Sequence, residues 1–206
     1  MKALLIFDLD GTLFQAKPVY LRADLDFLSE YGVPAPDENT LLKYTARGLD
    51  MFLRALLPED MDIPTARECF IGLVCKAIVE SGELYPGISE MLRKFRGDGH
   101  ELAVCSFSPE EYVRTVLEHT GIAGIITRYN CADTNGSKAE AVRALLRPGV
   151  PAIVIGDTHG EMEAARENGL PFIAAAYGYG NKAMLAAADH TANTPDEIND
   201  CIGRAL

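Results

Sequence analysis

The chain has 206 residues, enough for one buried core and a modest inserted domain, and its 48% hydrophobic and 24% charged residues exclude disordered and fibrous classes. Its formal net charge of −11 disfavours nucleic acid and anionic membrane surfaces as partners, but leaves room for a small anionic substrate where cations gather locally. The apolar N-terminal run is too short for a signal peptide, and no later stretch reaches a membrane-spanning length. Five scattered cysteines without C-x-x-C spacing indicate reduced thiols. We therefore expect a cytoplasmic protein.

The first predicted element is a buried strand over residues 3–7, which ends at two carboxylates, Asp8 and Asp10. Because side chains alternate along an extended chain, both carboxylates project to one side and Leu9 to the other. Carboxylates at the end of a buried strand are costly unless a metal or ligand meets them. Ligands of open α/β sheets bind at this position, so we expect a site there, with a solvated Asp-Gly turn as the alternative.

Residues 15–84 read as helices separated by prolines, without an alternating strand pattern. The clearest helix is predicted over residues 65–80, where apolar side chains recur at helical spacing. A helical insertion directly behind an acidic strand end suggests a cap over the site. Within it, Arg47 could bind a substrate carboxylate or phosphate as a planar fork, with a solvated helix face as the alternative.

From residue 85 onward, predicted strands and helices alternate. The expected strands cover residues 101–105, 124–127, 152–155 and 172–175, and the expected helices cover residues 85–96, 137–146, 160–167 and 195–204, with another beginning at Pro109. This alternation predicts an α/β fold with a mostly parallel sheet covered by helices on both faces. The predicted organisation is a Rossmann-like core of residues 1–14 and 85–206 with a helical cap domain of residues 15–84.

Polar residues follow several of these strands, Ser106 after residues 101–105 and Asp157 after Gly156. The ends of parallel strands lie at one edge of a sheet, so we expect Asp8, Asp10, Ser106 and Asp157 to converge. Three carboxylates would repel one another unless a divalent cation lay among them, and Mg²⁺ prefers such oxygen ligands.

Lys138 is the candidate cation for this edge. Ser137 and Glu140 form a capping-box pattern that places Lys138 in the first turn of a helix. A lysine there opposes the helix dipole, which is a mild indication of function; a solvated surface lysine is the alternative.

These residues together resemble the four motifs of the haloacid dehalogenase superfamily. The matching segments are, in order, Asp8-Leu9-Asp10-Gly11-Thr12-Leu13, Ser106, Lys138 and Gly156-Asp157-Thr158-His159-Gly160-Glu161. The helical insertion is similar to the family's cap of the first type, and Tyr85-Pro86-Gly87 and Tyr177-Gly178-Tyr179-Gly180 resemble its phosphoglycolate-phosphatase-like branch. The resemblance implies a Mg²⁺-dependent phosphatase that hydrolyses a small phosphorylated metabolite through an aspartyl-phosphate intermediate.

The resemblance also implies roles for individual residues. Asp8 would be the nucleophile, and Asp10 would protonate the leaving oxygen and then deprotonate the hydrolytic water. Phosphate or substrate would be bound by Leu9, Asp10, Ser106, Phe107 and Lys138, together with Arg47 of the cap. Mg²⁺ would be held by Asp8, the main-chain carbonyl of Asp10, Asp157 and Glu161.

Two positions depart from the family pattern. Phe107 stands where many relatives have Asn, so a side-chain contact to the substrate is in doubt. Glu161 stands where relatives often have Asp, and Thr158-x-x-Glu161 also fits a capping box, so Glu161 either supports the metal or only caps its helix. His159, alone in a turn that opens a helix, is interpreted as structural.

Three other functions remain open. A phosphomutase of the same superfamily is the first, although relatives of that kind usually carry Val where this chain has Thr12. A dehalogenase would need neither Asp10 nor a metal. A non-catalytic phosphate sensor or phosphoacceptor protein would have no use for the acid-base residue or the cap. The sequence does not choose among phosphoglycolate, sugar phosphates, nucleotides and pyrophosphate as the substrate.

Overall fold

The computed structural model describes residues 2–45, 49–58, 61–131 and 136–206. The chain forms two compact units. We call Met1–Gln15 together with Glu83–Leu206 the core unit, and Ala16–Gly82 the helical unit.

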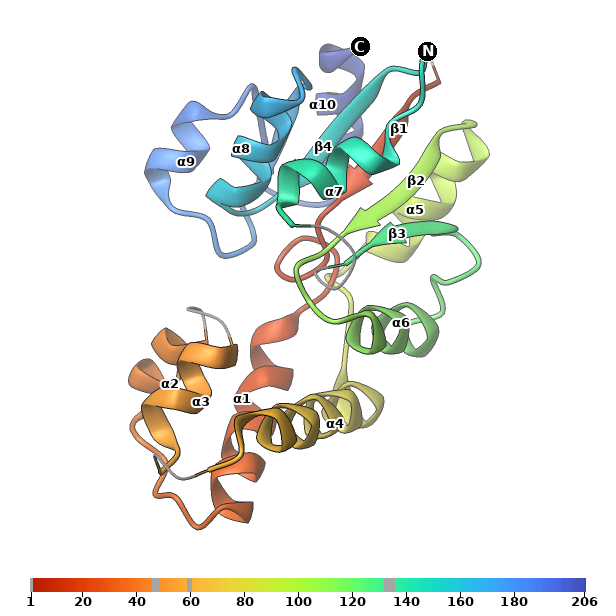
Figure 1. The fold of residues 1–206 in the computed structure, drawn as a ribbon. Coiled ribbons are helices and arrows are strands. Elements are labelled where there is room, and N and C mark those ends of the chain that lie inside the picture. The colour runs from red at the N-terminus through yellow and green to blue at the C-terminus, as the bar shows by residue number, and fades with distance from the viewer. Residues whose placement is uncertain (1, 46–48, 59–60, 132–135) are drawn as a thin grey trace. The chain divides into compact units, whose positions relative to one another are not determined.

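The core unit is built on a six-stranded parallel sheet in the order β3-β2-β1-β4-β5-β6 (Figure 1). The strands are β1 (Leu4–Phe7), β2 (Glu101–Cys105), β3 (Arg128–Asn130), β4 (Ala152–Gly156), β5 (Phe172–Ala175) and β6 (His190–Ala192). All four residues of β1 are buried. A parallel strand that is covered on both faces has such a continuous apolar run, because both sets of side chains face the core. Because β1 pairs with both β2 and β4, the carboxyl ends of these three strands lie side by side.

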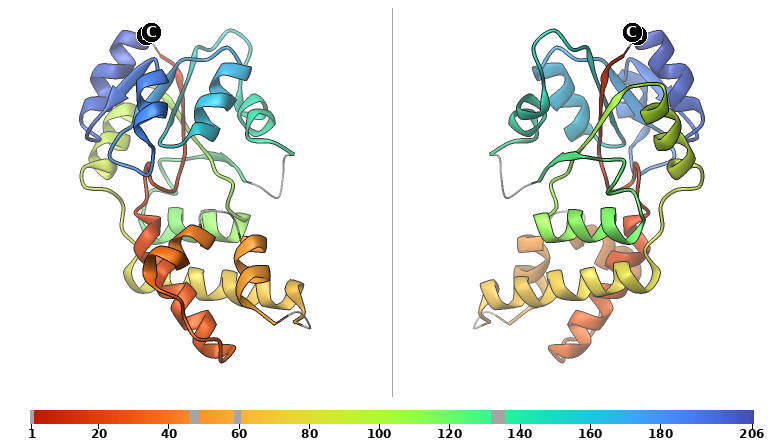
Figure 2. Two further views of the ribbon diagram at one scale, coloured as in Figure 1. Left: turned by 90° about the vertical axis from the view of Figure 1, so that its left-hand side faces the viewer. Right: turned by 90° about the vertical axis from the view of Figure 1, so that its right-hand side faces the viewer.

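Helices cover both faces of this sheet, as Figure 2 shows. One face carries α5 (Ile88–Gly97) and α10 (Glu197–Ala205), and the other carries α7 (Lys138–Leu145) and α8 (His159–Glu167). Two further helices, α6 (Glu110–His119) and α9 (Lys182–Ala187), follow β2 and β5 along the chain. The predicted Rossmann-like α/β fold is confirmed.

The described part of the helical unit contains α1 (Ala16–Glu30), α2 (Glu38–Thr45), α3 (Leu49–Leu56) and α4 (Ile63–Ser81). Its core includes three buried aromatic rings, with the Phe70 ring centroid 5.4 Å from that of Phe27 and 5.2 Å from that of Phe52. The helix predicted over residues 65–80 lies within α4, while Arg47 lies outside the described residues. Among the helices described in either unit, none is both long and apolar enough to cross a bilayer.

The strand predicted over residues 124–127 is wrong. The N–H groups of Ile125 and Ile126 both donate to the carbonyl of Ile122 at 2.9 Å, which folds this apolar segment into a turn. The strand β3 begins at Arg128 instead, and neither β6 nor α9 was expected. Both β3 and β6 are short edge strands with partly exposed residues, so they lack the buried apolar run that marks a central strand.

Candidate active site

The carboxyl ends of the three central strands bring the predicted site residues together. Asp8 follows β1, Ser106 follows β2 and Asp157 follows β4, and all three side chains are buried. The Asp8 N–H donates to the Ile155 carbonyl at 2.8 Å, which extends the β1 to β4 pairing to the catalytic candidate itself. The convergence that parallel pairing predicts is therefore present.

Lys138 connects two of the acids. Its Nζ donates to Oδ1 of Asp8 at 2.5 Å and also donates to the Glu161 carboxylate. Burial raises the pKa of Asp8 well above its usual range; Lys138 opposes this shift, and the negative charges of Glu161 and Asp157 add to it. Burial disfavours the Lys138 ammonium as well, but the two carboxylates raise its pKa, so Lys138 stays charged.

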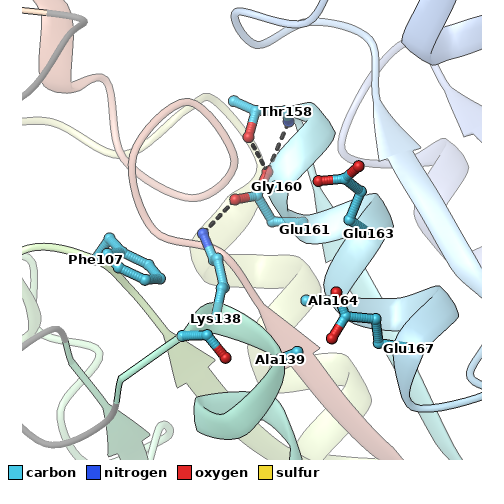
Figure 3. Close-up of a pocket in the computed structure, with 10 residues that line it drawn as sticks. Phe107, Lys138, Ala139, Thr158, Gly160, Glu161, Glu163, Ala164 and Glu167 are labelled. Carbon is cyan, nitrogen blue, oxygen red and sulfur yellow. Dashed lines mark hydrogen bonds and ion pairs between the residues drawn. The ribbon is translucent and has the colours of Figure 1, made fainter.

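Ser137 fixes the start of the helix that carries Lys138. Its side chain accepts the Glu140 N–H at 3.2 Å, as the capping pattern predicts. Lys138 therefore lies at the beginning of α7, beside a pocket of about 430 Å³ between the N-terminal part of α7 and the length of α8. Figure 3 shows Lys138 between Phe107 and Glu161 in this pocket.

Glu161 has two sets of contacts that explain its position. Its Oε2 accepts the Thr158 N–H at 2.7 Å and the Thr158 hydroxyl at 2.5 Å, and its other oxygen accepts from Lys138 (Figure 3). Burial would raise the pKa of Glu161, but Lys138 and the bonds from Thr158 hold it below its ordinary value. The predicted capping box is confirmed. Metal support by Glu161 stays a prediction.

Asp157 is held at both oxygens. The Thr12 hydroxyl donates to Oδ1 at 2.9 Å, and the Tyr179 N–H donates to Oδ2 at 2.7 Å. Burial raises the pKa of Asp157 to about 6, and the Tyr179 and Thr12 bonds partly oppose that shift. The hydroxyl of Tyr177 in turn donates to the Thr12 carbonyl at 2.9 Å. The valine of the mutase pattern could not make the Thr12 bond.

The segment Tyr177-Gly178-Tyr179-Gly180 approaches Asp157 more closely than side chains would allow. A Cβ on Gly178 would lie 2.3 Å from the Gly11 carbonyl oxygen and 2.4 Å from the Asp157 Cβ. Sequence reasoning used this segment only as a mark of the family branch and missed its contacts. The alternation of glycine with tyrosine could have indicated these contacts, because a loop whose main chain packs closely against other residues needs glycine at the contact points.

Asp10 is partly buried and held by two hydroxyl groups. Tyr112 donates to its Oδ1 at 2.5 Å and Ser108 donates to its Oδ2 at 3.0 Å. Burial raises the pKa of Asp10 to about 6, although both hydrogen bonds lower it. Sequence reasoning assigned no role to Tyr112 or Ser108. The only signal was that a buried tyrosine usually needs a partner for its hydroxyl group.

The segment after β2 presents Ser106 and Phe107. The Ser106 Oγ accepts the Ser108 N–H at 3.1 Å, so its own proton can be donated to a ligand oxygen. Phe107 is 53% exposed, and its ring centroid lies 5.9 Å from Lys138 Nζ. Phe107 therefore offers an aromatic ring at the position where the family resemblance implies an amide side chain.

Two further residues named in the sequence analysis, Leu9 and His159, direct their side chains into contacts within the protein. The Leu9 side chain is fully buried and its carbonyl accepts the Leu13 and Phe14 N–H groups at 2.9 Å, so any contact of Leu9 with phosphate must come from its main chain. His159 Nε2 lies 2.9 Å from the Glu163 carboxylate, and both side chains are exposed. All five cysteines are free, as predicted.

Comparison with known proteins identifies the family. Residues 5–175 match the sequence pattern described as "Haloacid dehalogenase-like hydrolase". The chain belongs to the haloacid dehalogenase-like hydrolase family. It is therefore an enzyme of the hydrolase class, and the resemblance seen in its four motifs is confirmed.

Curated relatives of this haloacid dehalogenase-like hydrolase include phosphoglycolate phosphatases. The Rhodobacter capsulatus protein of that name is 29% identical over 208 residues, covering 95% of this chain and 94% of the relative. The Vibrio cholerae protein of that name is 27% identical over 219 residues, covering 98% and 95%. The similarity to the phosphoglycolate-phosphatase-like branch is thus also confirmed.

Solved structures share the fold over almost the whole chain. A haloacid dehalogenase-like family hydrolase from Streptococcus pneumoniae superposes with a TM-score of 0.82 at 26% identity, covering 98% of both chains. CbbY from Rhodobacter sphaeroides in complex with phosphate superposes with a TM-score of 0.79 at 23% identity, covering 96% of both chains. The second similarity concerns the fold alone.

Proposed function

We propose that this hydrolase is a Mg²⁺-dependent phosphatase that cleaves the phosphate monoester of a small metabolite through an aspartyl-phosphate on Asp8. The observation that carries the proposal is the contact between Lys138 and Asp8 at the edge of the sheet. A buried cation beside a buried carboxylate favours the ionised, nucleophilic form and offers a positive charge to phosphate. Asp10, the proposed acid-base group, lies two residues after Asp8 in the chain.

The residues divide the reaction between them. An Asp8 oxygen forms a bond to phosphorus while the bond from phosphorus to the ester oxygen breaks, and Asp10 gives its proton to that leaving oxygen. Asp10 then takes a proton from water, whose oxygen attacks phosphorus and releases Asp8 and inorganic phosphate. Ser106 and Lys138 bind phosphate oxygens throughout. Phosphoryl transfer needs mainly positioning and charge neutralisation, which this set provides.

The donor set fits Mg²⁺. Asp8 and Asp157 follow the paired strands β1 and β4, whose carboxyl ends lie side by side, and both side chains are buried. Among the described residues, no group of three or more His, Cys, Asp or Glu side chains gathers as a metal site, and Mg²⁺ is commonly held by only one or two carboxylates with water and phosphate. We assign Mg²⁺ to Asp8, the Asp10 carbonyl and Asp157. When bound, it would neutralise charge on the transferring phosphoryl group.

We assign Glu161 to capping and to the pairing with Lys138, because its contacts with Thr158 and Lys138 account for its buried position without a metal. The helical unit would act as the cap that selects the substrate, with Arg47 as a proposed contact. The names of the relatives make phosphoglycolate the first substrate to test.

The test is steady-state phosphate release from phosphoglycolate, sugar phosphates, a nucleotide and pyrophosphate, with Mg²⁺ or chelator. Multiple turnovers of the native protein that vanish with chelator and in Asp8→Asn are expected. Movement of phosphate between positions of a sugar phosphate without release would indicate a mutase. Stoichiometric labelling of the protein without continuing release would indicate a phosphoacceptor, and either result would overturn the proposal.

A further inference from the structure

We propose that Tyr112 and Ser108 are positioning residues for Asp10, holding its carboxyl group in the orientation from which it gives and takes the catalytic proton. We call the two hydroxyl groups the Asp10 clamp. This inference rests on the proposed function and adds to it two residues that act through Asp10 without touching the reacting phosphoryl group.

The clamp engages both oxygens of one carboxyl group. Tyr112 donates to Oδ1 at 2.5 Å and Ser108 donates to Oδ2 at 3.0 Å. A carboxyl held at a single oxygen can still rotate about its Cβ–Cγ bond, whereas one held at both oxygens cannot turn without breaking a bond. The two contacts therefore define the plane of the Asp10 carboxyl as well as its place.

The clamp is itself held rigidly. Tyr112 is 2% exposed, and its ring packs edge-on against Phe14, with centroids 6.5 Å apart and an interplanar angle of 81°. The Phe14 carbonyl accepts the Gly11 N–H at 2.9 Å, so Phe14 belongs to the turn that also carries Asp10. The Ser108 N–H donates to Ser106 Oγ at 3.1 Å. The same segment thus orients the acid-base group and the proposed phosphate ligand.

Hydroxyl groups suit a residue that must change its protonation state. A main-chain N–H or a lysine only donates, and so would favour the carboxylate alone. Tyrosine and serine hydroxyls donate to a carboxylate and, after rotating, accept from a protonated carboxyl. The Asp10 clamp can therefore keep its hydrogen bonds in both halves of an acid-base cycle, and fixed orientation is a major source of catalytic rate.

The experiment compares kcat/KM for two phosphate esters in native protein, Tyr112→Phe and Ser108→Ala. Loss of an alkoxide from phosphoglycolate requires a proton from Asp10, whereas p-nitrophenolate leaves without one. For a mispositioned acid we expect a loss of about tenfold or more for phosphoglycolate, within the range that general acid catalysis contributes. The kcat/KM for p-nitrophenyl phosphate, which reports the first transfer step, should hardly change.

Two controls separate positioning from folding. Ser108→Thr keeps a hydroxyl group and should restore the phosphoglycolate rate. Tyr129→Phe removes an exposed tyrosine hydroxyl that bonds Glu110 at 3.2 Å, and should leave both esters unaffected. Equal losses for the two esters, or no loss for either, would overturn the clamp. Absence of turnover of both esters by the native protein would instead overturn the proposed phosphatase, on which the clamp depends.

Discussion

The ammonium nitrogen of Lys138 lies 2.5 Å from Oδ1 of Asp8, although 130 positions separate the two residues in the chain. Both side chains are largely buried, with 13% and 8% of their surfaces exposed. Parallel pairing places Asp8 at the carboxyl end of the central strands. The Ser137 cap starts the helix whose first residue, Lys138, contacts Asp8. Through this contact and its pairing with Glu161, Lys138 offsets the charge of two buried carboxylates of the site.

Removing the positive charge of Lys138 should lower the stability of the protein as well as its activity. Lys138→Ala leaves the Asp8 and Glu161 carboxylates buried without a counter-charge, and breaking a buried pair in this way costs about 3–5 kcal/mol. Urea unfolding at neutral pH measures the loss. The matched control is Lys76→Ala, whose exposed pair with Glu80 should be worth less than about 1 kcal/mol. Similar losses in the two variants would show that the buried pair is not special.

Glu161→Gln tests the assignment of Glu161 to capping and pairing. An amide oxygen can still accept from Thr158, so α8 should remain intact, while the charge that faces Lys138 is lost. We expect a lower turnover rate with an unchanged Mg²⁺ concentration for half-maximal activity. A Mg²⁺ titration, followed by activity and by calorimetry, measures whether the Mg²⁺ requirement changes. A large increase in the Mg²⁺ requirement would make Glu161 a supporter of the metal.

Gly178 lies outside the four motifs, but Gly178→Ala should still disturb the hydrogen bonding of Asp157. The added methyl group would collide with the Gly11 carbonyl and with Asp157, so the Tyr179 N–H would be displaced from its bond to Oδ2. We expect a loss of about 1–3 kcal/mol in unfolding free energy, as for other overpacked positions, and weaker Mg²⁺ binding by calorimetry.

The control is Gly203→Ala in α10, where nothing lies within 4 Å of the new methyl group. It should be neutral or stabilise the helix by up to about 1 kcal/mol, because alanine is a better helix former than glycine. Equal behaviour of the two alanine variants would mean that the segment tolerates a side chain beside Asp157.

The sequence predicted those parts of the protein that depend on local pattern. The apolar run before Asp8, the Ser137 cap before Lys138 and the run before Asp157 each mark an element, and the rule for parallel strands then brings the residues together. The contacts of Asp10 with Tyr112 and Ser108 join residues about 100 positions apart, and no short-range pattern encodes them. The same holds for the Tyr179 bond to Asp157.

The cysteines should differ in reactivity according to burial. Burial raises the pKa of the Cys105 thiol to about 12, so almost no thiolate exists at pH 8. Cys105, Cys131 and Cys201 are buried, whereas Cys69 and Cys75 are partly exposed. Iodoacetamide treatment followed by peptide mass spectrometry should therefore label only the last two in the native protein and all five in urea. Prompt native labelling of Cys105 would contradict its buried position beside Ser106.

The most direct test of the account is the mass of the protein quenched in acid during turnover of phosphoglycolate with Mg²⁺. The account predicts one additional phosphoryl group on the peptide that contains Asp8, decaying when the substrate is exhausted and absent from Asp8→Asn. Sustained phosphate release with the phosphoryl group on another residue, or with the same labelling in Asp8→Asn, would contradict it.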